Sequence, residues 1–276
     1  MSTAPLLMSG IPRISAYREL LEAPLFRAME SFSDEFLRRH AFVQNHYTWV
    51  KDPLHQWSRQ WEYPFVYQAI TSAIQPGSRV RILDAGSGIT FFPYYLANTV
   101  KGSSITCCDS DASLQSLFEQ VNEPAVRFIE ADLHSLPFAD DEFDMVYCVS
   151  VLEHTRNYAR ILDEYRRVLR PGGSLILTFD IGLDGVSDIA LEPMRVLLAE
   201  VEKRFRCQSE SAEVDIDHAE ILTSRYARTL DAQLLPWRFP RLALLKATLR
   251  AKRLPISLNK NLTVYCSIFI KPADQN

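Results

Sequence analysis

The sequence is poor in cysteine, and its thiols are not spaced for a disulfide framework or a zinc site. Its five cysteines are an odd number, and no two of them have C-x-x-C spacing. Cys108, Cys148 and Cys266 lie in apolar, strand-like runs. The pattern therefore predicts small buried thiols in a reducing compartment and excludes a disulfide-stapled secreted domain.

Long apolar runs and a strong net charge are also absent. No run approaches the roughly 18 apolar residues of a membrane-spanning helix, and no basic region followed by an apolar core stands at the N-terminus. The formal net charge is -4 at pH 7, so no bulk attraction to nucleic acid or to an anionic membrane is expected. We therefore expect a cytoplasmic enzyme without a transmembrane segment, and nucleic acid is not an expected partner.

A glycine-containing turn between an apolar strand and an apolar helix is the most informative stretch present. It lies in residues 79–97, RVRILDAGSGITFFPYYLA. Gly86 and Gly88 permit a sharp turn and a close approach of a ligand, because glycine has no Cβ. Phe91 stands where a dinucleotide fingerprint has its third glycine, which weighs against a pyrophosphate-bearing cofactor. The stretch predicts a nucleotide-binding turn, and a tight turn without a ligand is the alternative.

Strands and helices alternate from this point onward. Short β-prone runs are expected at 80–84, 104–108, 126–130, 144–149, 174–179 and 262–270, with 206–216 as a candidate sixth strand. Such alternation predicts an α/β fold with a doubly wound, mainly parallel seven-stranded sheet whose last strand is antiparallel.

Two regions are expected to extend this core. Residues 1–74 are predicted to form an N-terminal helical and aromatic cap, with helices over 31–50 and 64–74 and a partly irregular start. Residues 75–276 form the nucleotide-binding domain, in which 181–258 supply helical additions, including an insertion before the last strand.

LDAGSG, at residues 83–88, resembles motif I of the class I S-adenosylmethionine-dependent methyltransferases of type 11. Four further segments resemble later motifs of that family in the same order: ITCCDSD (105–111), EADLHSLPFADDEFDMVYCVSVLEH (130–154), LRPGGSLILTFD (169–180) and NLTVYCSIFIKP (261–272). The ordered set is specific, although no single member is. The resemblance implies a Rossmann-like fold and S-adenosylmethionine as the cofactor.

The resemblance also implies where the parts of the cofactor bind. Asp109, at the end of the second strand, would accept hydrogen bonds from the ribose hydroxyls, while Asp111 is a competing acid that we expect to cap the next helix. Asp132 would accept from the adenine amino group, and Asp84 would lie near the methionyl amine. The implied cofactor-binding residues are Asp84, Ala85, Gly86, Ser87, Gly88, Asp109, Ser110, Asp132, Leu133, Cys148 and Val149.

The pair Glu153–His154 follows the fourth strand and supplies the catalytic candidates. Histidine side chains have an unperturbed pKa near neutrality, which makes His154 a candidate for the base that removes a hydroxyl proton. One member of the pair could instead turn inward and order the loop. Some RNA 2′-O-methyltransferases and quinone O-methyltransferases resembling this stretch hold a divalent metal at such a pair, but Ser150 stands where the RNA-directed pattern has glutamate. No metal site is predicted.

An aromatic-rich segment precedes the nucleotide-binding core. Tyr47, Trp57, Trp61 and Tyr63 are candidates for a substrate-binding lid over the acceptor, and a small satellite core is the alternative for each of them.

These observations favour a methyltransferase acting on a small-molecule acceptor, with O-methylation of a sugar or secondary-metabolite hydroxyl as the leading hypothesis. The alternatives are a metal-assisted RNA or quinone O-methyltransferase and a non-catalytic nucleotide-fold binding protein. A nicotinamide-dependent oxidoreductase is disfavoured by Phe91 and Asp132. The sequence gives neither the acceptor nor the oligomeric state.

Overall fold

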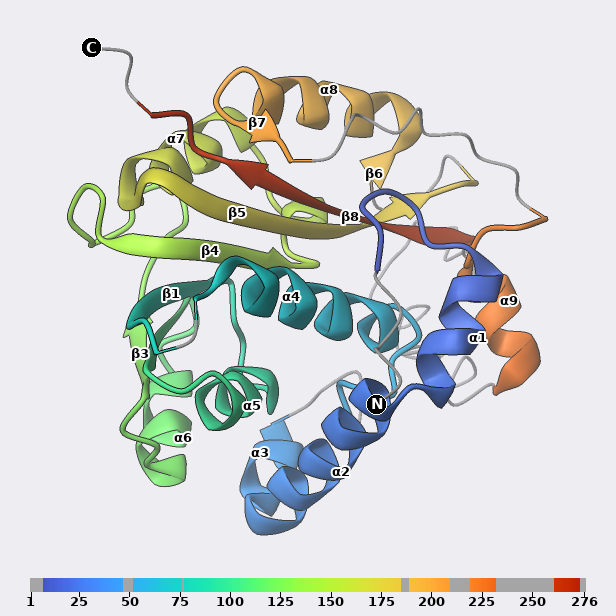
Figure 1. Cartoon of the computed structure of the whole chain (residues 1–276), viewed down its shortest axis with the longest axis horizontal. Helices are drawn as coiled ribbons and strands as arrows, with labels where there is room; N and C mark the ends of the chain where they lie inside the picture. Colours follow the sequence, from blue (N-terminus) through green and yellow to red (C-terminus); the bar gives the residue numbers. More distant parts are fainter. Residues whose placement is uncertain are drawn as a thin grey trace, which may run out of the picture.

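A twisted, mostly parallel β-sheet divides the molecule into two helical layers (Figure 1). The computed structural model describes residues 7–46, 52–75, 77–184, 189–208, 219–231 and 261–273. Within these residues the sheet has eight strands in the order β3-β2-β1-β4-β5-β8-β7, with β6 paired to β5. The strands are β1 (Val80–Ala85), β2 (Ser103–Asp109), β3 (Val126–Glu130), β4 (Phe143–Val149), β5 (Leu169–Gly182), β6 (Ile189–Ala190), β7 (Arg206–Cys207) and β8 (Leu262–Ile270).

The predicted α/β fold with an antiparallel last strand is confirmed. Strands β3, β2, β1, β4 and β5 pair in parallel, whereas β8 pairs antiparallel with both β5 and β7. The sheet was predicted to have seven strands, and the short β6, paired with β5, adds an eighth. The strand order reverses at β1, which lies between β2 and β4. Ligands of open α/β sheets bind at such a reversal, beyond the carboxyl ends of the strands.

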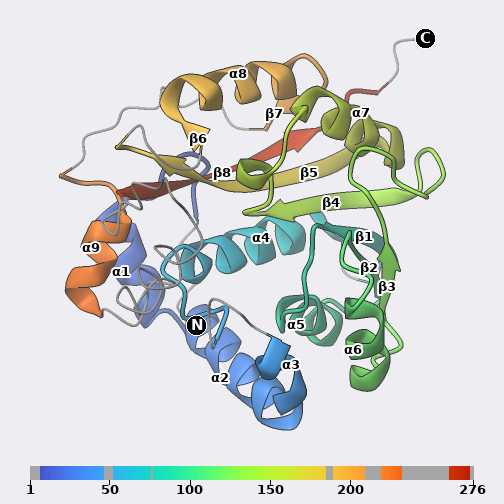
Figure 2. The same ribbon diagram turned by 180° about the vertical axis from the view of Figure 1, so that it is seen from behind.

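The helices cover both faces of the sheet. Helices α4, α5 and α6 lie on one side and α7 and α8 on the other, with α1 to α3 packed outside the first layer (Figures 1 and 2). Their bounds are α1 (Ile14–Glu22), α2 (Pro24–Arg39), α3 (Ala41–His46), α4 (Arg59–Ala73), α5 (Phe92–Thr99), α6 (Leu114–Val121), the 3-10 helix η1 (Leu152–His154), α7 (Tyr158–Val168), α8 (Leu191–Glu202) and α9 (Ser224–Leu230). No helix among the described residues is both long and apolar enough to cross a membrane.

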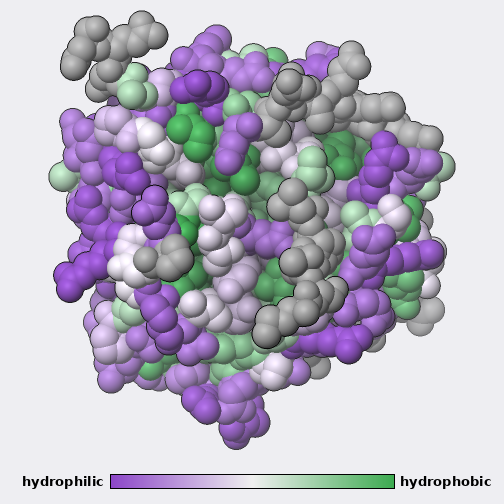
Figure 3. All heavy atoms as spheres, in the orientation of Figure 1, coloured by the Kyte–Doolittle hydropathy of each residue, from purple (hydrophilic) through white to green (hydrophobic). Residues whose placement is uncertain are grey.

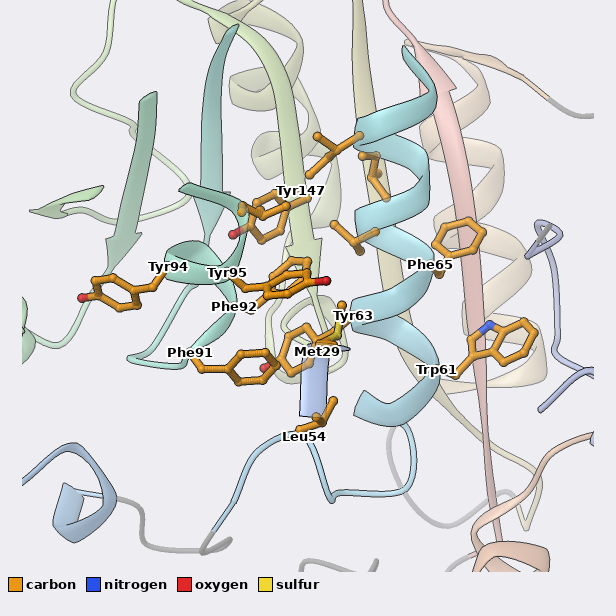
Figure 4. Close-up of a cluster of buried hydrophobic side chains, with 14 of the residues drawn as sticks. Met29, Leu54, Trp61, Tyr63, Phe65, Phe91, Phe92, Tyr94, Tyr95 and Tyr147 are labelled. Carbon is orange, nitrogen blue, oxygen red and sulfur yellow. The ribbon is translucent and has the colours of Figure 1, made fainter. Parts of the chain in front are cut away.

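Each face of the sheet has its own apolar core. Phe65 of α4 and Phe92 of α5 pack on one face, while Leu162 of α7 and Leu197 of α8 pack on the other. Figure 4 shows part of the first core, with Tyr63 of α4 and Phe92 of α5 lying between these two helices. On the outer face drawn in Figure 3, hydrophilic side chains dominate the periphery and apolar ones appear mainly in recesses.

The N-terminal region is more regular than its sequence indicates. The expected irregular start contains α1 and the first part of α2, where Pro24 occupies the first helical turn that proline tolerates. Helix α4 begins at Arg59, upstream of the predicted start, and Pro64 lies inside it. Proline removes one helical hydrogen bond, but α4 is buried along most of its length, and tertiary packing offsets that loss.

The buried face of α4 gives a direct test of this packing. Phe65 is 0% exposed, so we expect Phe65→Ala to lower the free energy of unfolding by about 3–5 kcal/mol in urea denaturation. Val196→Ala is the control, because Val196 is 60% exposed on α8 and should change stability by less than about 0.5 kcal/mol. Equal effects of the two substitutions would contradict the core assignment.

Candidate active site

A cavity of about 620 Å³ opens at the carboxyl ends of β1, β2 and β4, where the strand order reverses. Its size lies within the usual range for ligand-binding pockets. The start of α4 and the turn before it form the opposite wall. The lining residues are His46, Pro53, Gln56, Arg59, Tyr63, Asp84, Gly86, Ser87, Gly88, Ile89, Thr90, Asp109, Asp111, Leu114, Tyr147, Val149, Ser150, Val151 and His154.

The glycine turn after β1 forms the floor of the cavity. The Gly86 and Ser87 amides donate to the Cys108 carbonyl at 2.8 and 3.0 Å, which bends the chain across β2. Gly86 has φ +76°, and a Cβ there would lie 2.7 Å from Val151 Cγ2. Gly88 has φ +52°, and a Cβ there would meet nothing within 4 Å. Only glycine fits at position 86, because a Cβ there would clash with Val151, whereas Gly88 leaves open space beside the cavity for a ligand.

Asp109 stands beside this turn at the end of β2. Its Oδ2 accepts from the Gly88 amide at 2.9 Å, and its Oδ1 accepts from the Asp111 amide at 3.1 Å. Asp111 accepts from both the amide and the hydroxyl of Ser113, and these bonds lower the pKa of Asp111. The expectation that Asp111 caps α6 is wrong, because the N-cap of that helix is Ser113 and no side chain makes a capping bond there. Asp111 also lines the cavity, with Oδ2 3.9 Å from His46 Nε2.

Asp84 lies deep in the cavity at the end of β1. It accepts a hydrogen bond from the Tyr147 hydroxyl at 2.7 Å. Burial raises the pKa of Asp84 to about 7, although the Tyr147 hydrogen bond lowers it, and the charge of Asp109 raises it further. This carboxyl group therefore titrates near neutral pH, and a ligand cation placed beside it would stabilise the charged form.

The other expected cofactor residues are not among those that line the cavity. Ala85 and Cys148 are buried, and Ser110 is exposed. The Asp132 side chain is 68% exposed; its Oδ1 accepts from the His134 amide at 2.9 Å and lies 2.7 Å from His134 Nδ1. Leu133 is half-buried against the second core. The adenine contacts implied for Asp132 and Leu133 remain predictions.

The Glu153–His154 pair is divided between the interior and the cavity. Glu153 turns inward, and its Oε1 accepts from the Asp180 amide at 3.2 Å. Burial raises the pKa of Glu153 to about 8, and the charge of Glu62 acts in the same direction while Arg59 opposes it. His154 is exposed and lines the cavity. Of the two catalytic candidates, His154 is the one that a bound acceptor can reach.

The four aromatic residues predicted to form a substrate-binding lid do not all lie in the cavity wall. Trp57 and Trp61 are 0% and 2% exposed and belong to the first core, which agrees with the satellite-core alternative rather than with a lid. Tyr63 lines the cavity and stacks on Phe92 with ring centroids 4.6 Å apart. Figure 4 shows Tyr63 and Trp61 on different sides of α4. Tyr47 lies outside the described residues.

The first turns of α4 contribute a polar cluster that the sequence did not indicate. Glu62 is 0% exposed, and it accepts from Arg59, from the Ser150 hydroxyl at 2.8 Å and from the Thr178 hydroxyl. Ser150 has the left-handed φ of +49°, unusual for a residue other than glycine. The sequence signal that could have indicated this cluster is the charged pair Arg59 and Glu62, three positions apart in an aromatic-rich helix (RQWE).

Among the described residues, no group of three or more His, Cys, Asp or Glu side chains is arranged to hold a metal ion.

Comparison with known proteins agrees with this geometry. The family model of the methyltransferase domain matches residues 83–177, which run from the end of β1 into β5. This part of the chain belongs to the class I S-adenosylmethionine-dependent methyltransferases. The cofactor is therefore S-adenosylmethionine, and the open space at Gly88 and the carboxylates of Asp84 and Asp109 fit a nucleoside that carries an amine and a sulfonium.

Several curated proteins are similar to parts of this chain. Methyltransferase GfsG of Streptomyces halstedii is 32% identical over 39% of this chain and 40% of its own. A phthiotriol/phenolphthiotriol dimycocerosates methyltransferase of Mycobacterium ulcerans is 31% identical over 50% of this chain and 54% of its own. The chain thus spans about half the length, or less, of these relatives.

The solved structures with similar folds are more distant in sequence. The [4+2]-cyclase SpnF superposes with a TM-score of 0.54 at 18% identity, covering 96% of this chain and 100% of that one. The MccD protein gives a TM-score of 0.51 at 16% identity, covering 78% of this chain and 98% of that one. At these identities the likeness concerns the fold alone.

The raised pKa of Asp84 predicts a pH-dependent affinity for S-adenosylhomocysteine. Below about pH 7 the carboxyl is protonated and must lose its proton to face the ligand amine, so the affinity should fall up to about tenfold for each pH unit. Calorimetric titration across that range measures this. The Asp84→Asn variant should bind S-adenosylhomocysteine more weakly, and its affinity should depend less on pH. If the affinity of that variant has the same pH dependence as the wild type, a group other than Asp84 is responsible for the titration.

Proposed function

We propose that this methyltransferase transfers the methyl group to a small-molecule acceptor, at a hydroxyl oxygen of a sugar or secondary metabolite. The observation that carries the proposal is one continuous cavity that reaches from the glycine turn to the exposed imidazole of His154. A cofactor seated on the turn and an acceptor hydroxyl beside His154 would share that cavity.

Bound S-adenosylmethionine supplies a methyl group already activated on a sulfonium sulfur. The protein then has to align the acceptor oxygen, exclude water and remove the hydroxyl proton. In this proposal His154 takes that proton, and Tyr63 and Gln56 form the wall against which the acceptor lies. Glu153, held inward on the Asp180 amide, fixes the short helix η1 that carries His154.

The composition of the wall favours a small acceptor over nucleic acid. Asp84, Asp109 and Asp111 line the cavity, and among the described lining residues Arg59 is the one arginine or lysine. A nucleic-acid acceptor would instead favour a basic surface along its phosphates. The curated relatives include a tRNA U34 carboxymethyltransferase of Nautilia profundicola, 31% identical over 41% of this chain, so an RNA acceptor is the alternative to exclude.

The experiment is a transfer assay with methyl-labelled S-adenosylmethionine against a panel of hydroxylated small molecules, with matched amines and with bulk tRNA. Label transferred to a hydroxylated compound supports the proposal. Transfer to tRNA alone favours the RNA alternative. Saturable cofactor binding without transfer to any compound favours a binding protein.

Once an acceptor is found, substitutions of His154 and Glu153 in η1 distinguish a catalytic role from a structural one. His154→Ala should lower turnover by roughly 10²–10⁴-fold without changing the affinity for S-adenosylhomocysteine, because the imidazole acts on the acceptor proton. Glu153→Gln is the control, and it should keep most of the turnover, because burial raises the pKa of Glu153 toward the neutral form and the Gln side-chain oxygen can still accept from the Asp180 amide. Full turnover in His154→Ala at all pH values would remove the base from the mechanism.

A further inference from the structure

The turn that precedes α4 forms part of the cavity wall. Pro53 and Gln56 line the cavity. Leu54 and Trp57 are each 0% exposed and belong to the first core. His55 lies between them in the sequence, and its imidazole contacts helix α2. The turn therefore presents two residues to a bound ligand, anchors two in the interior and uses one to reach a neighbouring helix.

The His55 imidazole joins two carboxylates. Its Nδ1 lies 2.6 Å from Asp52 Oδ2, in the same turn, and its Nε2 lies 2.9 Å from Glu30 Oε1, on α2. The other oxygen of Asp52 accepts from the Leu54 amide at 2.9 Å. Asp52 thus ties the imidazole to the backbone of the turn, and Glu30 ties the imidazole to α2.

This geometry requires a protonated imidazole. A neutral imidazole has a single N–H donor, so one of its two nitrogens would turn a lone pair toward a carboxylate. An imidazolium donates from both nitrogens. In agreement, the hydrogen bond to Asp52 and the charges of both carboxylates raise the pKa of His55 to about 9, although burial opposes them. His55 therefore carries a positive charge at neutral pH.

Acidic groups face this imidazolium from both elements that pack against it. Within the described ranges these titratable groups are Asp52 on the turn and Glu30 and Asp34 on α2. Burial raises the pKa of Asp34, the charges of Asp52 and Glu30 act in the same direction, and the charge of His55 opposes them. Without the positive charge of His55, carboxylates of the turn and of α2 would repel each other.

We propose that His55 is a positioning residue of the cavity, whose imidazolium clamps the turn to α2 and so holds Pro53 and Gln56 in the wall that a bound ligand meets. The inference depends on the cavity and not on the identity of the acceptor. The pKa of His55 in the folded protein lies above its ordinary value of about 6.5. The clamp is therefore complete below about pH 6.5 and is lost as the pH rises through about 9.

The test measures the affinity for S-adenosylhomocysteine by calorimetric titration from about pH 7 to 10, a range that spans the pKa of His55. The variants are His55→Gln, which cannot donate to both carboxylates, and His55→Arg, which keeps a permanent charge and donors on two edges. His40→Gln is the matched control, because His40 ends the same helix α2 and does not line the cavity. The amine of the ligand titrates in the same range for every protein, so the proteins are compared at each pH.

At pH 7 we expect His55→Gln to bind roughly 5-fold or more weakly than the wild type, and His55→Arg and His40→Gln to bind nearly as well as the wild type. Amide hydrogen exchange over residues 52–58, measured by mass spectrometry at pH 7, should be faster in His55→Gln than in the wild type, because the turn is less firmly held. As the pH rises through about 9, the wild type should weaken toward His55→Gln, whereas His55→Arg should not.

Glu30→Gln supplies a second, quantitative check. It removes one of the carboxylates that raise the pKa of His55, so the loss of affinity should begin at a lower pH than in the wild type. Equal affinity of His55→Gln and the wild type at pH 7 would overturn the proposal. A His55→Arg variant that binds no better than His55→Gln would overturn it as well, because the charge would then not be what holds the wall.

Discussion

The buried carboxylate of Glu62 connects helix α4 to the sheet beside the cavity. It accepts from Ser150 at the end of β4, from Thr178 in β5 and from Arg59 in its own helix. A charge at 0% exposure is tolerated only when hydrogen bonds and a counter-charge replace its water, and here both are present. The same contacts fix the position of α4 over β4 and β5, the conformation of Ser150 and the direction of the Arg59 side chain. The wall of the cavity that the start of α4 forms therefore depends on Glu62.

The side of the cavity formed by the glycine turn after β1 depends on backbone geometry instead. Gly86 fits under Val151 only because it lacks a Cβ, and Asp109 ties the Gly88 amide to the end of β2. The cavity that results combines a rigid glycine turn with a buried acid, Asp84, whose pKa is raised by burial. A cofactor with two positive groups and one carboxylate matches a wall that has several acids and one arginine. Charge complementarity of this kind favours one ligand class over nucleotides that carry phosphates.

The sequence predicted the parts of the site that are local in the chain and missed those that are not. The strand–glycine–helix segment and the acids at the ends of β1 and β2 are defined by short motifs, and the structure places Asp84, Gly86, Gly88 and Asp109 around one cavity. The Glu62 contacts join residues 88 and 116 positions apart, and no periodicity or spacing reveals such pairs. Composition could not separate Trp61, which packs in the core, from Tyr63, which lines the cavity two residues later. Helix α4 was predicted over residues 64–74, whereas it begins at Arg59, because burial along most of its length stabilises the turn before Pro64.

The most direct test of the central claim is a calorimetric titration of the purified protein with S-adenosylhomocysteine, with NADH titrated in parallel and with Asp109→Ala beside the wild type. The account predicts saturable binding of S-adenosylhomocysteine alone, weakened in Asp109→Ala because the ribose hydroxyls lose their acceptor. Binding of NADH alone would contradict the assignment of the cavity to S-adenosylmethionine. Equal affinity of Asp109→Ala and the wild type for S-adenosylhomocysteine would contradict the placement of the ribose on Asp109.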